Sequence, residues 1–167
     1  SSMLPLIAER GAGGELIELF GHIPRAAPLA RLASDGMPVA VLANGPNAYI
    51  SPSLVPQPDW GPTWNFAAAT IAGTFRFCEA ETDESLRRLG RHLEGDAWTV
   101  ERMGPRYGTL IHAVVAFRIA VTSIDARFKL GQDENDTNFA AIVAHHPDRT
   151  LADWMRAFRP APAGDDR

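Results

Sequence analysis

The residues best suited to chemistry lie at the two ends of one proline-rich loop. Residues 48–66 read AYISPSLVPQPDWGPTWNF, with four prolines between the two ends. Each proline fixes its own φ angle and removes a backbone donor, so the loop is stiff and irregular. Side chains with hydroxyl, amide or indole groups gather at its ends: Ser51, Ser53, Thr63, Trp64 and Asn65. Such a loop is typical of a binding site, although the same pattern also suits a plain connection between two strands.

Two motifs of this loop resemble a known family. YISPS at 49–53 and PTWNF at 62–66 resemble the signature YISPSWY…PTWNY of the PaiB-type proteins. The resemblance covers about residues 4–143. Weaker matches occur in the family's order: LPL at 4–6, GHIPRAAP at 21–28, GPNAY at 45–49 and FKLGQ at 128–132.

The resemblance implies a fold, a cofactor and a partner. PaiB-type proteins are described as FMN-binding negative transcriptional regulators with a flavin-binding split β-barrel, which is related to the pyridoxamine 5′-phosphate oxidases. It therefore implies a homodimer that binds FMN between its subunits, acting as a flavin-dependent oxidoreductase or a flavin-linked regulator. DNA as a partner follows from the family name alone. The alternative is a regulatory or structural homodimer that keeps the fold and has lost the cofactor.

Under this resemblance, the polar residues divide among three parts of FMN. The phosphate needs cations or backbone N–H groups, and Lys129, Arg25 or Arg127 would supply the charge. The flat ring needs apolar cover, which Trp64 would supply. Hydrogen-bond partners for the ring edge would come from Ser51, Ser53, Thr63, Asn65 and Gln132. Taken alone, Trp64 equally suits a core position and Lys129 a surface position.

Four positions depart from the family pattern. The family's HLPL histidine is Met3 here, its SWY is SLV at 53–55, and the histidine after its PTWNY is Thr70. Its SQNR segment reads GQDE at 131–134, and more acid follows at Asp136. Carboxylates close to a phosphate would repel it, so we expect weak and salt-sensitive binding of FMN. The alternative is that these acids face solvent or cap the helix that follows.

The composition is that of an ordinary soluble domain. The chain has 167 residues, 46% hydrophobic and 22% charged, with a net charge of -4. This mildly acidic balance does not indicate a nucleic-acid-binding protein. The densest basic group, Arg87, Arg88 and Arg91, is typical of a solvent-exposed helix face. The single cysteine, Cys78, excludes an internal disulfide and favours a reducing, cytoplasmic location. No apolar run approaches the ~20 residues of a membrane-spanning helix.

No residue suggests itself as a catalytic acid, base or nucleophile. The pair His145 and His146, with Asp148 nearby, could suggest a metal site. However, side chains at adjacent positions of a helix do not face one site, so we expect no metal. No G-x-S-x-G nucleophile motif occurs.

Alternation of apolar and polar residues predicts most of the strands. The clearest is 67–80, where Ile71, Gly73 and Phe75 fall on one face. A second strong strand is expected at 115–122. Shorter strands are predicted at 4–8, 15–23, 39–42 and 48–51, with a glycine hairpin turn at 10–14 and a further turn at 44–46.

Helical spacing and capping residues predict five helices. One begins at a Thr82 cap, buries Leu86, Leu89 and Leu93, and ends at Gly95. In another, Thr150 and Asp153 have the spacing of a capping box. The predicted helices are 28–33, 83–94, 107–113, 138–144 and 150–158.

Many short strands with a few helices indicate a β-rich α+β fold. Together with the family resemblance, this predicts a split β-barrel of the FMN-binding type with a few short helices. We expect a single domain at 1–159, with a C-terminal helical extension at about 138–159 and a flexible tail at 160–167.

Overall fold

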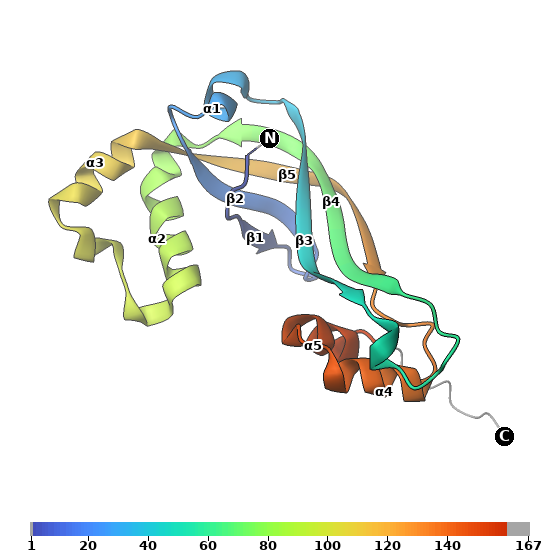
Figure 1. The fold of residues 1–167 in the computed structure, drawn as a ribbon. Coiled ribbons are helices and arrows are strands. Elements are labelled where there is room, and N and C mark those ends of the chain that lie inside the picture. The colour runs from blue at the N-terminus through green and yellow to red at the C-terminus, as the bar shows by residue number, and fades with distance from the viewer. Residues whose placement is uncertain (1, 160–167) are drawn as a thin grey trace. The chain divides into compact units, whose positions relative to one another are not determined.

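The computed structural model describes residues 2–159. They contain a five-stranded sheet with the strand order β1-β2-β5-β4-β3, accompanied by short helices (Figure 1). The strands are β1 (Ile7–Arg10), β2 (Leu16–Pro24), β3 (Pro38–Ile50), β4 (Thr63–Phe77) and β5 (Val114–Lys129). The helices are α1 (Pro28–Leu32), α2 (Thr82–Glu94), α3 (Pro105–Ala113), α4 (Asp136–His145) and α5 (Arg149–Ala157). Short 3₁₀ turns are η1 (Pro52–Leu54), η2 (Glu79–Glu81), η3 (Gly95–Ala97) and η4 (Val100–Met103).

The chain divides into two compact units. Unit 1 comprises Ser1–Val41 and Ile71–Ile124, and unit 2 comprises Leu42–Thr70 and Asp125–Arg167. Each unit has its own apolar core. The expectation of a single domain at 1–159 therefore stays a prediction, and the predicted tail at 160–167 lies outside the described residues. No helix of the described part is long and apolar enough to cross a membrane.

The core of unit 1 lies on one face of its antiparallel strands. β1 and β2 form the predicted hairpin, whose turn includes Gly14 at φ 85°. Phe75 stacks on Phe117 with ring centroids 5.1 Å apart. A side chain at Gly73 would lie 2.6 Å from the carbonyl oxygen of Ala120, so glycine lets β4 approach β5 closely. The buried residues of this cluster are Leu19, Ile23, Ile71, Phe75, Val115, Phe117 and Ile119.

Helix α2 lies against β2 and differs from its prediction in two details (Figure 1). Thr82 is the first helical residue, not the cap; its hydroxyl donates to the Glu79 carbonyl at 2.8 Å and accepts from the Ala116 amide. Leu86 is buried as expected, but Leu93 is 63% exposed. The last turn, which ends at Gly95, therefore leaves the apolar core.

Several arginines of unit 1 form ion pairs. Arg118 bridges Glu18 and Glu81, each at 2.6 Å, and its guanidinium lies 4.0 Å from the centroid of the Phe20 ring. Arg88 pairs with Glu9 at 2.5 Å. Of the basic group on α2, Arg87 and Arg88 are thus paired with neighbouring carboxylates, which fits a solvated helix face.

The turn predicted at 44–46 is wrong. β3 runs without interruption through Asn44, Gly45 and Pro46. β3 is last in the strand order, and an edge strand tolerates a proline because one side of its backbone makes no ladder bonds.

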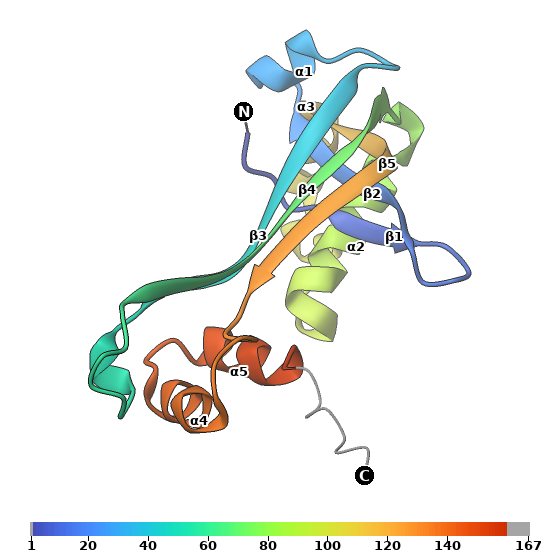
Figure 2. The same cartoon turned by 90° about the vertical axis from the view of Figure 1, so that its right-hand side faces the viewer.

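Helices α4 and α5 lie side by side and form most of the core of unit 2 (Figure 2). Asn135 caps α4, accepting from the Asn138 amide at 2.8 Å. Asp148 caps α5, accepting from the Leu151 amide at 3.0 Å, so the predicted Thr150 cap is wrong. The core residues are Ile50, Leu130, Phe139, Ile142, Val143, Leu151, Ala152 and Met155.

Buried His146 joins the α4–α5 turn to β3. Its Nδ1 accepts a hydrogen bond from the Asp148 amide at 3.1 Å, so the neutral ring carries its proton on Nε2. Nε2 then donates to the Tyr49 carbonyl at 3.1 Å. His146 therefore has a structural role that uses both ring nitrogens.

Candidate ligand-binding site

Seven of the residues proposed for a ligand belong to unit 2. They come from three short stretches: the start of the proline loop, the start of β4, and the end of β5 with the turn after it. They are Ser51, Ser53, Thr63, Trp64, Asn65, Lys129 and Gln132.

Ser51 and Ser53 form a hydroxyl pair at the start of the loop. The Ser51 Oγ accepts from the Ser53 amide at 3.2 Å and lies 2.8 Å from the Ser53 Oγ. One hydroxyl must donate to the other, which leaves a single O–H free to donate elsewhere. The pair therefore offers one donor and several acceptor lone pairs at an exposed position.

Lys129 and Thr63 are brought together by the ends of β5 and β4. The Lys129 ammonium donates to the Thr63 hydroxyl. Lys129 is the only lysine of the chain, and Arg127 lies two residues earlier, on the same face of the strand. This end of β5 therefore carries two exposed cations. Arg25, the third cation considered for a phosphate, belongs to unit 1 and pairs with Glu79 at 2.5 Å.

Trp64 lies at the surface of unit 2, not in its core. Its side chain is 52% exposed, and that of Tyr49 is 50% exposed. The two rings lie 6.3 Å apart and are tilted by 58°. Two exposed aromatic rings of this kind can cover a flat ligand.

Asn65 points the opposite way, as alternation along a strand requires. Its side chain is 2% exposed, and its Nδ2 contacts the Met155 sulfur at 3.6 Å. The carbonyl oxygen Oδ1 is buried and has no hydrogen-bond partner among the described residues. Asn65 thus lies at the end of the loop in sequence but is buried in the structure. A buried acceptor without a donor is costly and is typical of a functional position.

Gln132 closes the turn that follows β5. Its Oε1 accepts from the Leu130 amide at 2.7 Å, and its Nε2 donates to the Phe128 carbonyl at 3.0 Å. Gly131, at φ 76°, permits this tight turn. Both polar ends of Gln132 are therefore engaged by the main chain.

Two of the three acids in segment 133–136 contact other side chains of unit 2. Both carboxylate oxygens of Glu134 accept from the Trp60 indole N–H at 3.1 Å. Asp136 pairs with Arg159 at 2.6 Å. Asp136 nevertheless faces solvent, with its side chain 96% exposed, and the helix that follows is capped by Asn135 and not by one of the acids. The expectation of weak, salt-sensitive binding of FMN stays a prediction.

Sequence reasoning missed the residues that hold the loop. Trp60 reaches Glu134, and the buried Asn138 donates through Nδ2 to the Gln57 Oε1 at 2.9 Å. A tryptophan in the middle of a polar, proline-rich loop was the one available signal, because so large a ring seldom stays uncovered.

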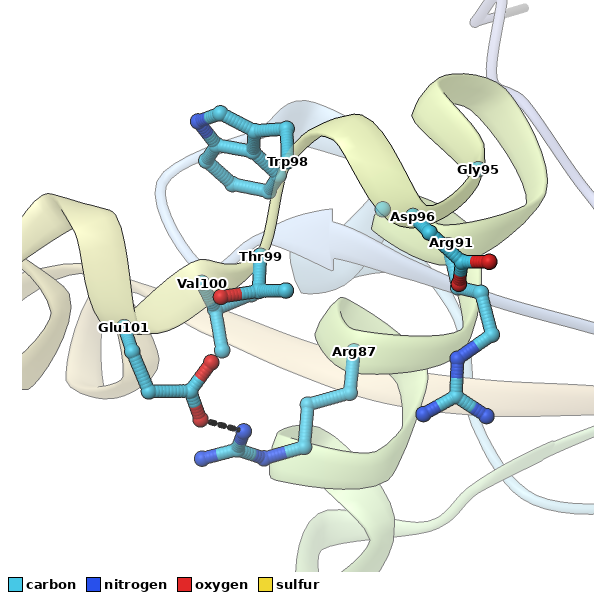
Figure 3. Close-up of a pocket in the computed structure, with 9 residues that line it drawn as sticks. Arg87, Arg91, Gly95, Asp96, Trp98, Thr99, Val100 and Glu101 are labelled. Carbon is cyan, nitrogen blue, oxygen red and sulfur yellow. Dashed lines mark hydrogen bonds and ion pairs between the residues drawn. The ribbon is translucent and has the colours of Figure 1, made fainter.

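A cavity lies in unit 1, beside the C-terminal half of α2 (Figure 3). It has a volume of about 260 Å³. In the close-up, Arg87 and Glu101 face each other and are joined by an ion pair. Arg91 and Asp96 add one charge of each sign to the wall, so the lining carries no net charge.

The shifted pKa values belong to unit 1. Burial, with the hydrogen bond that Tyr107 donates to Asp83 at 2.7 Å, raises the pKa of Tyr107 to about 12. The Arg87 side chain holds the pKa of Glu101 at about 2. Burial raises the pKa of the Cys78 thiol and lowers that of His22, whose Nδ1 lies 3.1 Å from the Ser85 hydroxyl. None of these groups is among the proposed ligand residues.

Residues 1–123 match the model of a family described as "Putative FMN-binding domain". The chain is 28% identical over 132 residues to "Protease synthase and sporulation protein PAI 2" of Bacillus subtilis (strain 168), covering 75% of this chain and 62% of that protein. It is 27% identical over 127 residues to "Uncharacterized protein AN0679" of Emericella nidulans, covering 64% of this chain and 51% of that protein. The chain thus spans less than two thirds of the length of either relative.

The fold also resembles a solved structure, that of the flavocytochrome Anf3 from Azotobacter vinelandii. The TM-score is 0.50 at 19% identity, covering 75% of this chain and 54% of the other. At this identity the likeness concerns the fold alone. The predicted fold class, β-rich α+β of the split-barrel type, is confirmed.

Proposed function

The chain belongs to the FMN-binding domain family of the PaiB type, and from this membership we propose that it binds FMN. The observation that carries the proposal to particular residues is the surface of unit 2 around Trp64. The exposed indole of Trp64 and the hydroxyl pair of Ser51 and Ser53 lie at the two ends of the proline loop. The single lysine, Lys129, is hydrogen-bonded to Thr63 at one of these ends. They match the ring face, the ring edge and the phosphate in chemical type.

Lys129 is proposed to meet the phosphate. A phosphate monoester carries nearly two negative charges at neutral pH and is bound best by cations held in place. Thr63 fixes the Lys129 ammonium, and Arg127 adds a second charge on the same face. Arg159 offsets part of the charge of Asp136, which weakens its repulsion of the phosphate, whereas the indole N–H that Glu134 accepts from is neutral and leaves its charge in place.

Trp64 and Tyr49 are proposed to cover the ring, and the Ser51–Ser53 pair to donate to its edge. Asn65 is proposed as a further acceptor, reached from the opposite side of β4, because it faces away from Trp64 and its buried Oδ1 lacks a donor in the described chain. FMN, when bound, supplies reversible one- and two-electron redox chemistry. The residues of this chain would orient it and shield one face of its ring.

The biological setting is proposed in the same way. We infer a cytoplasmic location, because the single cysteine, Cys78, is a free thiol. We infer a homodimer, because several aromatic side chains of unit 2 are exposed and a second copy of the chain could cover them. A flavin-dependent oxidoreductase and a flavin-linked regulator both remain open to such a protein. The engagement of Gln132 by the main chain favours a second candidate, a regulatory or structural homodimer without flavin.

Titration of FMN into the purified protein separates the two. Binding should quench the flavin fluorescence, and the dissociation constant should rise with salt because the phosphate is held by charge. Sedimentation of the same samples gives the oligomeric state. A protein that leaves the spectrum and fluorescence of FMN unchanged at high concentration would refute flavin binding and favour the second candidate.

A further inference from the structure

We propose that Trp60 and Glu134 are positioning residues that fasten the middle of the proline loop to the start of α4. This inference rests on the proposed function, because the residues at the ends of that loop are the ones assigned to the ligand. Together with Gln57 and Asn138, these two residues are called the loop anchor below.

The loop anchor consists of two polar pairs. The Trp60 indole N–H donates to both carboxylate oxygens of Glu134, each at 3.1 Å. The second pair joins the Asn138 Nδ2 to the Gln57 Oε1 at 2.9 Å. The two pairs connect positions 74 and 81 residues apart in the sequence. They therefore hold together two segments that are far apart in the sequence and that no local turn or helix brings together.

The α4 side of the loop anchor is itself well fixed. Asn138 is 2% exposed, and its backbone amide donates to the capping side chain of Asn135. Glu134 follows directly after the tight turn that Gln132 closes. The loop is thus attached to a rigid support.

The loop cannot fix its own position through its backbone. Its four prolines offer no amide donors. Within the described chain, each of its backbone hydrogen bonds joins two residues that are three positions apart. The amides of Leu54, Val55 and Trp60 donate to the carbonyls of Ser51, Pro52 and Gln57, respectively. Such bonds shape local turns but do not connect the loop to the rest of unit 2. That connection depends on the loop anchor and on the packing of Leu54, Val55 and Trp60 against the core.

The position of the loop decides the spacing of the ligand residues. Ser51 and Ser53 stand at one end, and Thr63, which holds Lys129, at the other. A loop released from α4 would sample several arrangements of these groups, and a ligand would have to select one of them. Fixing the arrangement in advance raises affinity without adding a contact.

The test compares Trp60→Phe with Trp154→Phe. The first variant removes the indole N–H and keeps an aromatic ring in the core; the second removes an indole N–H that forms no hydrogen bond with the described residues. Hydrogen exchange of the ligand-free proteins reports on the amides of Leu54, Val55 and residue 60. We expect at least tenfold faster exchange of these amides in Trp60→Phe, with the Phe75 amide of unit 1 unchanged. Trp154→Phe should leave the loop amides as slow as in the wild type.

The same proteins are then titrated with FMN. Trp60→Phe should raise the dissociation constant at least tenfold, and Glu134→Gln, which keeps one acceptor oxygen for the indole, should raise it less. Should Trp60→Phe fail to fold, Glu134→Gln and Glu134→Ala provide the same comparison. Loop amides that exchange no faster in Trp60→Phe and Glu134→Ala would overturn the fastening.

The remaining outcomes are equally decisive. Faster loop exchange with unchanged FMN affinity would overturn the positioning role. A wild-type protein that binds no FMN would refute the proposed function and the positioning role together. The exchange data would still show whether the loop anchor exists, so the two failures can be told apart.

Discussion

The two units treat their polar side chains in opposite ways. In unit 1 the charges are matched to one another: Arg118 with Glu18 and Glu81, and Arg88 with Glu9. In unit 2 two buried polar atoms, Asn65 Oδ1 and Arg159 Nη1, have no hydrogen-bond partner among the described residues, whereas the one such atom of unit 1, Glu9 Oε1, lies in the ion pair with Arg88. A scaffold satisfies its polar groups internally, whereas a binding region keeps some of them for a ligand. The predictions below test the roles assigned to the two units.

The largest effect is expected from Phe117→Ala in unit 1. Phe117 is buried and stacks on Phe75, so its removal leaves a cavity in the core. The free energy of unfolding should fall by about 3–5 kcal/mol. Denaturant unfolding measures this loss, and Phe128→Ala, at an exposed ring, serves as the control with a loss of about 1 kcal/mol or less. Equal losses in the two variants would show that the core of unit 1 has been misidentified.

Lys129→Met should affect the ligand and not the fold. A hydrogen bond to a charged group contributes about 1.5–3 kcal/mol, so the dissociation constant for FMN should rise by about 10- to 100-fold. The melting temperature should stay the same, because Lys129 is exposed. The matched control is Arg25→Met, which removes an exposed cation from unit 1. If Arg25→Met weakens FMN binding as much as Lys129→Met does, the assignment of the phosphate to unit 2 fails.

Two asparagines with the same burial offer a sharper comparison. Asn65 and Asn138 are each 2% exposed, but Asn138 is hydrogen-bonded through its side chain and Asn65 has an unpaired oxygen. Asn138→Leu should cost about 1 kcal/mol of stability, whereas Asn65→Leu should cost nothing or stabilise by a similar amount. Thermal unfolding of the ligand-free variants checks both. A marked loss in Asn65→Leu would mean that its amide is satisfied in solution, which would remove the case for an unused acceptor.

How far the sequence predicts this molecule depends on whether a feature is local. The strand around Phe75, the glycine hairpin and the end of α2 at Gly95 follow from periodicity and backbone preference, and the structure confirms them. Leu93 fits the same helical spacing but is exposed. The spacing identifies the apolar side of the helix, but it does not show how far along the helix the neighbouring strands extend.

The candidate site was predictable in composition and less so in geometry. The motif around Trp64 identified the stretch, and alternation required Trp64 and Asn65 to face opposite ways. Only the fold decides which of the two faces inward. The contact of Trp60 with Glu134 spans 74 residues, and no local pattern indicates so distant a partner.

The smallest expected effect concerns the pH dependence of unit 1. The pKa of Tyr107 is raised to about 12, first by burial and then by its hydrogen bond to Asp83. A phenol whose pKa is higher in the folded state than its ordinary value of about 10 binds its proton more tightly in that state. The resulting stabilisation is complete below pH 10 and is lost as the pH rises through 12.

The wild type should therefore lose stability between pH 10 and 12, and Tyr107→Phe should lose less over the same interval because it has no phenol to ionise. Denaturant unfolding of both proteins at pH 8, 10 and 11.5 measures the difference, and the FMN affinity at pH 8 should be equal in the two. Parallel pH profiles would show that the Tyr107–Asp83 contact is not formed in solution, and a loss of FMN affinity would break the division of labour between the two units.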